Sequence, residues 1–300
     1  MAACVRVDDL LLRRWPLPHP DPEGDKYARG SALVVAGSRE MPGAAMLAGE
    51  AALRAGAGRV RIATGATVAS AVAAAVPEAR VMALPETAGG GLMPVGAAKL
   101  DADAGEVDAL LVGPGLLEEN VGVEFVRAVL PGFGAKPVVL DALAMGAVAG
   151  AEPFDAPVLL TPHAGEMAKL LGVDKDRVVA DPMAAANDAA RRWNVVVALK
   201  GATTAIATPH GETWLHEGGD AGLGTAGSGD VLAGLIVGLA ARGAPLAQAA
   251  VWGVALHGRA GVALAARIGS PGYLARELAA QVPALLRALA QSDLPSMRAT

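Results

Sequence analysis

Short apolar runs rich in β-branched residues recur along the chain, and they constrain the fold more than any other feature. They lie at 31–38, 60–64, 109–115, 137–142, 157–163, 195–201 and 203–208. Continuous apolar runs of this length are typical of strands that are buried on both faces. Alanine-rich helical stretches separate several of them, at 43–56, 66–76, 119–130, 165–171 and 181–193. This alternation predicts an α/β layered domain with a largely parallel central sheet.

The last third of the chain changes character. Residues 229–242, 245–268 and 272–290 are expected to form successive helices, with no further strand between them. No internal repeat or low-complexity linker divides the sequence, so residues 1–300 are expected to form a single domain. The proline-rich residues 1–23 are interpreted as an N-terminal arm.

Composition excludes several classes of protein. The chain is 53% hydrophobic with a net charge of -5 and has no lysine or arginine cluster, which argues against a nucleic-acid partner. Cys4 is its only cysteine, so neither a disulfide framework nor a cysteine zinc site is expected. The apolar run at 231–241 is shorter than the roughly 18 residues that a membrane span needs. The first residues lack the features of a signal peptide, and we expect a cytoplasmic protein.

Polar or glycine-rich residues follow the apolar runs, where a parallel sheet binds its ligands. These residues are Ser38, Gly113, Gly115, Asp141, Thr161, His163, Glu166, Lys200 and Thr203. The carboxyl ends of parallel strands meet at one edge, so we expect these residues to converge on one site.

The segment GLGTAGSGDVLAG, residues 222–234, matches the G-x-G-x-x-G spacing of a dinucleotide-binding loop. That loop should follow the first strand and be followed by an acid about 20 residues later on the next strand. Here the segment lies late, the residues around 245–250 offer no acid, and no strand follows. The Rossmann interpretation is therefore disfavoured.

Residues Gly227, Ser228 and Gly229 precede a strongly apolar helix. Small residues at a helix N-terminus let backbone N–H groups face an anion such as a phosphoryl group. Asp230 in the first turn would then be a base beside this anion hole. The alternative is a first-turn acid that only stabilises the helix. A P-loop is excluded, because no lysine is followed by Ser or Thr.

Lys200 ends a buried run and could meet phosphates, although it could equally extend to solvent from a sheet edge. His163 could face the ligand or lie in a surface loop, and residues 113–115 could form a plain turn or a surface for a flat ligand. The remaining histidines are scattered and predict no metal site.

In combination, these segments resemble the ribokinase-like superfamily, and within it the ADP/ATP-dependent NAD(P)H-hydrate dehydratases. The resemblance lies in 24–58, 111–116 (LVGPGL), 138–145 (VVLDALAM), 159–172 (LLTPHAGEMAKLLG), 196–236 and 249–261, in family order. It implies a three-layer α/β/α ribokinase-like sandwich. It also implies that the enzyme phosphorylates the ring hydroxyl of the S-epimer of NAD(P)H hydrate from ADP or ATP, after which loss of phosphate restores NAD(P)H.

The resemblance assigns roles to particular residues. Asp230 would be the base and contact the hydrate, and Gly227, Ser228 and Gly229 would form the anion hole. Ala44, Gly113, Gly115 and His163 would line the hydrate pocket. The adenine nucleotide would be held by Lys200, Gly201, Ala202, Thr203, Thr204 and Gly229. Mg²⁺ would accompany the nucleotide, with no protein residue predicted as a metal ligand.

Two departures from the family pattern stand out. Leu143 replaces an acid or glycine two residues after Asp141, and Asp141 is left out of the predicted site. Ala226 replaces a glycine ahead of the base. The resemblance further implies a homotetramer, with epimerase activity on a separate chain. Two alternatives remain: a ribokinase-like kinase of a vitamin precursor, and a nucleotide-binding module without catalysis.

Overall fold

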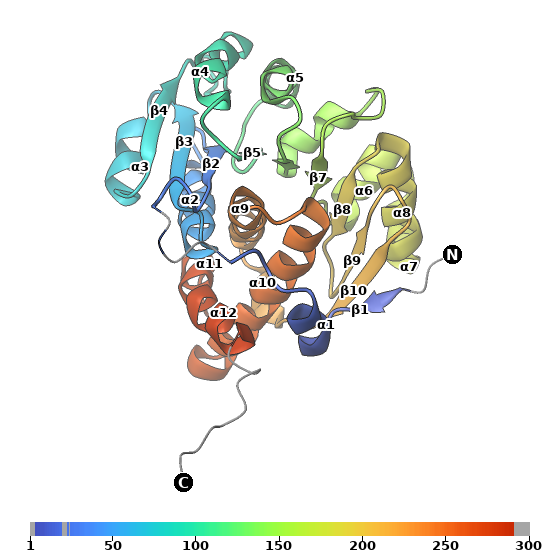
Figure 1. Ribbon diagram of the computed structural model, residues 1–300. Coiled ribbons are helices and arrows are strands. Elements are labelled where there is room, and N and C mark those ends of the chain that lie inside the picture. Colours follow the sequence, from blue (N-terminus) through green and yellow to red (C-terminus); the bar gives the residue numbers. More distant parts are fainter. Residues whose placement is uncertain (1–3, 20–22, 24, 291–300) are drawn as a thin grey trace.

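The computed structural model describes residues 4–19, 23 and 25–290. Its centre is a ten-stranded sheet in the order β1-β10-β9-β8-β7-β6-β5-β2-β3-β4, with β4 and β1 at opposite ends (Figure 1). The strands are β1 (Val5–Arg6), β2 (Ser31–Val35), β3 (Arg59–Gly65), β4 (Arg80–Leu84), β5 (Ala109–Val112), β6 (Val138–Leu140), β7 (Val158–Leu160), β8 (Val196–Leu199), β9 (Thr203–Ala207) and β10 (Thr213–Glu217).

The sheet is mostly parallel, as the sequence predicts. All pairs from β8 across to β4 are parallel, whereas β9 runs antiparallel to both β8 and β10. Every residue of β2 is buried, and its side chains alternate between two cores. Ala32 and Val34 belong to one core, and Leu33 and Val35 to the other. Burial on both faces explains why this strand is a continuous apolar run.

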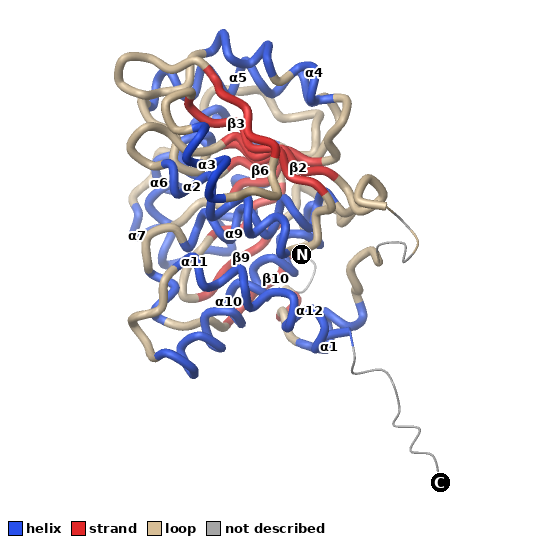
Figure 2. The backbone as a smooth tube through the Cα atoms, turned by 90° about the vertical axis from the view of Figure 1, so that its left-hand side faces the viewer, coloured by secondary structure: helices blue, strands red, loops and turns tan. Residues whose placement is uncertain are grey.

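Helices cover both faces and complete three layers (Figure 2). One face carries α1 (Asp9–Arg14), α2 (Pro42–Arg54), α3 (Ala69–Ala75), α9 (Ser228–Ala241), α10 (Leu246–Ile268), α11 (Ala275–Leu278) and α12 (Val282–Ala290). The other carries α4 (Asp101–Ala104), α5 (Glu119–Phe133), α6 (Ala164–Leu171), α7 (Lys175–Ala180) and α8 (Pro182–Trp193). Four 3₁₀ segments, η1 (Pro94–Lys99), η2 (Ala142–Val148), η3 (Ala221–Gly224) and η4 (Ala279–Gln281), connect these elements.

The seven predicted strands are all present, but β1, β4 and β10 were not predicted. These three lie at or next to the ends of the sheet, where one side of a strand meets solvent. Their residues are accordingly mixed, as in RVMAL of β4 and TWLHE of β10. The helix expected over 272–290 is divided into α11, η4 and α12. Edge strands therefore lack the apolar pattern on which the prediction depends.

The N-terminal segment packs against the body of the protein. Strand β1 pairs with β10, and Leu12 of α1 is fully buried. The ring of Trp15 stacks on Trp214 at a centroid distance of 5.6 Å. The carbonyl of Trp15 accepts hydrogen bonds from Trp252 at 2.9 Å and Gln248 at 3.1 Å. Residues 4–19 thus add a strand and a helix to the layers.

Helix α10 is long and apolar enough to cross a membrane, with a mean hydropathy of 1.3 over its most apolar stretch. However, 67% of that stretch is buried inside the protein, where it packs against α9 and α12. Its apolar character is accounted for by its place in the core.

Helices α2 and α9 cross at unusually close range. A Cβ at Gly238 would lie 2.5 Å from the carbonyl oxygen of Ala52, and Gly234 faces Ala48 in the same way. Ala51 and Ala55 line the same contact on α2. This stripe of small residues lets the two backbones meet, and it fixes the position of α9 over the sheet.

We expect Gly238→Ala to lower the free energy of unfolding by about 1–3 kcal/mol, because the added methyl would overlap the α2 backbone. Chemical denaturation measures the change. The matched control is Gly43→Ala in α2, where nothing lies within 4 Å of the added atom. There the better helix propensity of alanine should stabilise by up to about 1 kcal/mol. Equal stability of Gly238→Ala and the wild type would contradict the close crossing.

Candidate active site

The N-terminus of α9 lies at the carboxyl edge of the sheet. Gly227 precedes the helix with φ 88°, a conformation that favours glycine. The N–H of Ser228 donates to Thr225 and that of Val231 to Gly227. Between them, the N–H groups of Gly229 and Asp230 have no backbone partner among the described residues. Together with the helix dipole, equivalent to roughly half a positive charge, these groups have the arrangement that binds an anion, and we refer to them as the anion hole.

Asp230 lies in the first turn of this helix. Burial raises the pKa of its carboxyl to about 6, and the negative charge of Asp141 acts in the same direction. The ammonium of Lys200 opposes both effects. A carboxylate with a pKa near neutrality can both take up and release a proton under physiological conditions, which is the property a general base needs.

Lys200 lies beside the anion hole and is held by Asp141. Its Nζ is 3.1 Å from Asp141 Oδ1, which also accepts a hydrogen bond of 2.6 Å from the Thr161 hydroxyl. Burial disfavours the charged ammonium, but the carboxylates of Asp141, Glu166 and Asp230 outweigh it and raise the pKa of Lys200. A Cβ at Gly229 would lie only 3.4 Å from Nζ, so the glycine keeps the space next to the ammonium open.

A cavity of about 870 Å³ opens from the anion hole towards β8–β10 and α10. It is lined by His163, Lys200, Gly201, Ala202, Thr204, His216, Gly218, Gly219, Asp220, Ala221, Leu223, Gly224, Thr225, Ser228, Gly229, Leu232, Val254, His257 and Gly258. The structure thus places most of the predicted nucleotide-binding residues together on its wall. Thr203 does not line it; this residue lies in β9, opposite Glu217 of β10.

Three of the residues predicted to bind the hydrate, Ala44, Gly113 and Gly115, gather at a second place on the same edge, at the ends of β2 and β5, whereas His163 lines the cavity described above. A Cβ at Gly115 would lie 2.6 Å from the Cβ of Ala44 and 3.3 Å from the Cα of Gly37. Gly113, with φ 133°, adjoins the backbone of Asp141 so closely that any side chain would overlap its carbonyl. Ala44 and the glycine loop are therefore neighbours, and Asp141 connects them to Lys200.

His163 begins helix α6. Its Nδ1 accepts hydrogen bonds from the N–H groups of Gly165 at 3.0 Å and Glu166 at 3.1 Å. The Glu166 carboxylate in turn accepts from the N–H of His163, so the two residues form a capping box. His163 thus caps α6 and lines the cavity that holds most of the predicted nucleotide-binding residues, apart from the group of Ala44, Gly113 and Gly115 with which it was predicted to bind the hydrate.

Some groups in the site were given no role in the prediction. Asp141 was expected to converge with the other strand ends but was left out of the predicted site; it is buried beside Lys200, while the side chain of Leu143 packs towards Gly122 of α5. His216 and His257 line the cavity from β10 and α10. The segment LHG containing His257 was the only signal for the latter, since an isolated histidine in an apolar helix ordinarily reflects packing.

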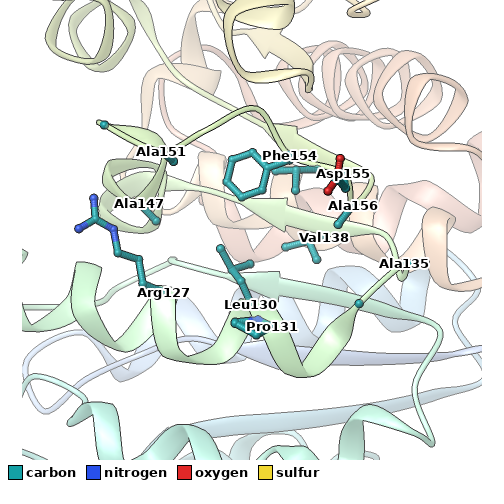
Figure 3. A pocket seen from close by; sticks show the side chains of 13 residues that line it. Arg127, Leu130, Pro131, Ala135, Val138, Ala147, Ala151, Phe154, Asp155 and Ala156 are labelled. Carbon is teal, nitrogen blue, oxygen red and sulfur yellow. The ribbon is translucent and has the colours of Figure 1, made fainter.

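A second cavity, of about 700 Å³, lies at the amino ends of the central strands β6 and β7 (Figure 3). Leu130, Val138 and Phe154 form apolar walls, and Val138 is the first residue of β6. Arg127 lies at the rim, where its guanidinium donates to the carbonyl of Ala149 at 2.8 Å. Arg127 and Asp155 are the only charged residues among the described residues of its walls, so this hollow lacks the lysine and the helix N-terminus found around Asp230.

Comparison with known proteins adds to this geometry. The family described as NAD(P)H-hydrate dehydratase matches residues 32–284. The ADP-dependent (S)-NAD(P)H-hydrate dehydratase of Xanthomonas campestris pv. campestris is 48% identical over 280 residues, which cover 93% of this chain and 95% of that protein.

Solved structures agree with the fold. The Bacillus subtilis ADP/ATP-dependent NAD(P)H-hydrate dehydratase, co-crystallised with ATP/Mg²⁺, superposes with a TM-score of 0.82 at 33% identity, over 96% of this chain and 100% of that one. A ribokinase-like superfamily protein from Enterococcus faecalis V583 gives a TM-score of 0.83 at 22% identity, over 96% and 97%. The predicted ribokinase-like fold is confirmed.

The raised pKa of Asp230 has a consequence for stability. In the unfolded chain this carboxyl titrates near 3.8, and in the folded protein near 6. The folded state therefore binds the proton more tightly, and stability falls as pH rises from about 4 to about 6. We expect Asp230→Asn to leave stability unchanged below pH 4 and to raise it by about 1–3 kcal/mol above pH 7.

Denaturant unfolding at a series of pH values measures this difference. Glu152→Gln, in an exposed loop, is the control for loss of one negative charge. If Asp230→Asn and the wild type are equally stable at pH 8, the charge of Asp230 does not destabilise the folded protein and the prediction is wrong.

Proposed function

The chain belongs to the NAD(P)H-hydrate dehydratase family, and on that basis we propose that it repairs damaged NAD(P)H. The reaction is the dehydration of NAD(P)H hydrate at the expense of ADP or ATP. The observation that carries this proposal is the juxtaposition of Asp230, Lys200 and the free N–H groups of α9. A base, a cation and an anion hole are the groups that transfer of a phosphoryl group to a hydroxyl requires.

We propose that the hydrate binds with its ring hydroxyl next to Asp230, against Ala44, Gly113 and Gly115. The nucleotide occupies the cavity beside Lys200, with its terminal phosphate in the anion hole. The hydroxyl oxygen forms a bond to the terminal phosphorus while the bond from phosphorus to the leaving nucleotide breaks. The hydroxyl proton passes to the Asp230 carboxylate.

The phosphate ester then decomposes. Its C–O bond breaks, phosphate departs with the electron pair, and a proton leaves the neighbouring ring carbon, which restores the reduced nicotinamide. The anion hole that stabilised the transferring phosphoryl group also stabilises the departing phosphate. The net change is loss of water from the hydrate and hydrolysis of one phosphoanhydride.

The residues present fit a nucleotide that carries Mg²⁺. Gly229 has no side chain, and this leaves the space next to the Lys200 ammonium free for a phosphate. A side chain at this position would approach Lys200. Among the described residues no group of three or more His, Cys, Asp or Glu side chains could hold a metal. Mg²⁺ commonly binds through substrate phosphates and one or two carboxylates, here Asp141 and Asp230. When bound, Mg²⁺ would neutralise charge on the transferring phosphate.

The direct test is incubation of the protein with NADH hydrate, Mg²⁺ and either ADP or ATP. We expect the NADH absorbance band to return in step with release of inorganic phosphate. Accumulation of a stable phosphorylated product instead would identify a small-molecule kinase and contradict the dehydratase. The comparison of ADP with ATP, and of NADH hydrate with NADPH hydrate, identifies the preferred substrates.

The role of Asp230 makes a separate prediction. Asp230→Asn should reduce turnover by about 10²-fold or more, since the substitution removes the base, while the dissociation constant for the nucleotide changes little. Lys200→Met should weaken nucleotide binding, and Lys175→Met, on the exposed surface of α7, is its control. Turnover by Asp230→Asn at the wild-type rate would refute the assignment.

A further inference from the structure

His257 of α10 contacts the first residue of α9. Its Nε2 lies 2.9 Å from the Ser228 hydroxyl and 3.1 Å from the Ser228 carbonyl oxygen. Ser228 is almost completely buried and directly precedes Gly229, whose N–H forms part of the anion hole. Both Ser228 and His257 line the nucleotide cavity. The contact therefore joins two helices at the place where the phosphate would bind.

One tautomer of the ring satisfies both contacts. A carbonyl oxygen can only accept a hydrogen bond, so the contact with the Ser228 carbonyl assigns the proton to Nε2. Burial lowers the pKa of His257 to about 4. The hydrogen bond to the Ser228 backbone raises this pKa, whereas the charges of Lys200 and His216 lower it further. The ring is thus neutral at physiological pH, with Nε2–H as donor and Nδ1 as acceptor.

The tautomer determines what the serine can do. Because Nε2–H is a donor, the Ser228 oxygen accepts from it and keeps its own proton for another partner. A histidine protonated at Nδ1 instead would take the serine proton as an acceptor and turn it away from the cavity. The same reasoning excludes a nucleophile–base pair, since a protonated Nε2 cannot receive the serine proton.

We propose that His257 is a positioning residue that holds Ser228 with its hydroxyl proton directed at the transferring phosphate. The hydroxyl then adds a third donor to the N–H groups of Gly229 and Asp230. This inference rests on the proposed function, because it concerns the same phosphate. Such a donor matters most when negative charge develops on the phosphoryl oxygens, so its loss should affect kcat more than KM.

Variants of His257 distinguish a role in positioning Ser228 from a role in packing α10 against α9. His257→Phe keeps the ring but removes the donor, and should lower kcat about 10-fold or more with a change in nucleotide KM below about threefold. His257→Gln places an amide N–H near the position of Nε2–H and should restore most of the activity. Val262→Ala, on an exposed part of the same helix, is the control and should behave as the wild type.

A double-mutant cycle tests whether His257 acts through Ser228. Ser228→Ala should lower kcat to a similar extent as His257→Phe, and the double variant should be no slower than either single one. Additive losses would overturn the proposal, as would wild-type kcat in His257→Phe. Should His257→Phe fail to fold, Ser228→Ala and His257→Gln still provide the comparison.

Nitrogen-15 NMR of the histidine rings provides a test independent of activity. We expect His257 to be neutral with its proton on Nε2 in the wild-type protein, and to remain so in Val262→Ala. A proton on Nδ1, or a charged ring at pH 7, would refute the inference. If the wild-type protein fails to dehydrate NAD(P)H hydrate, the proposed function fails, whereas the ring tautomer is still decided by this measurement.

Discussion

The close packing of α9 on α2 is the constraint on which the site depends. Helix α9 is buried along nearly its whole length, so it could be shifted only by displacing the core. Gly234 and Gly238 let it approach α2 closely, and this holds its N-terminus over the carboxyl ends of the central strands. Backbone N–H groups at a helix N-terminus that have no partner in the protein are satisfied by an anion or by water. The helix is thereby placed for binding an anion.

The charges around this helix end explain why the phosphate would arrive with a cation. Lys200 faces the carboxylates of Asp141, Glu166 and Asp230, so the local balance is negative. A nucleotide phosphate alone would add further negative charge to this group. Mg²⁺ on the phosphates would cancel part of this negative charge and would let the carboxylates act as partners of the complex. Burial is the main cause of the raised pKa of Asp230, and the negative charge of Asp141 adds to it.

Whether an element or a site residue can be predicted from the sequence depends on its place in the fold. Strands such as β2 are predictable because both faces are buried, whereas β4 and β10 carry polar residues at the ends of the sheet. The positions of residues 227–230 and of Lys200 were predictable from the apolar pattern. The former lie at the start of an apolar helix, and the latter directly follows an apolar strand. Asp141 was set aside because its neighbour Leu143 departs from the family pattern, yet Thr161 and Lys200 hold it in the site. The contact of His257 with Ser228 spans 29 residues, and no local pattern records it.

The arrangement of strands divides the site into two halves, with α9 between them. The cavity on the β8–β10 side presents Lys200 and the backbone of Gly201, which suit a nucleotide. On the β2–β5 side, Ala44 packs against the glycine loop, and it is beside these small residues that we propose the hydrate binds. An in-line phosphoryl transfer needs the donor and acceptor on opposite sides of the moving phosphorus. In the proposed reaction a helix that begins between the two halves would meet this requirement, because its N–H groups would contact the phosphoryl group throughout the transfer, with Asp230 on the acceptor side.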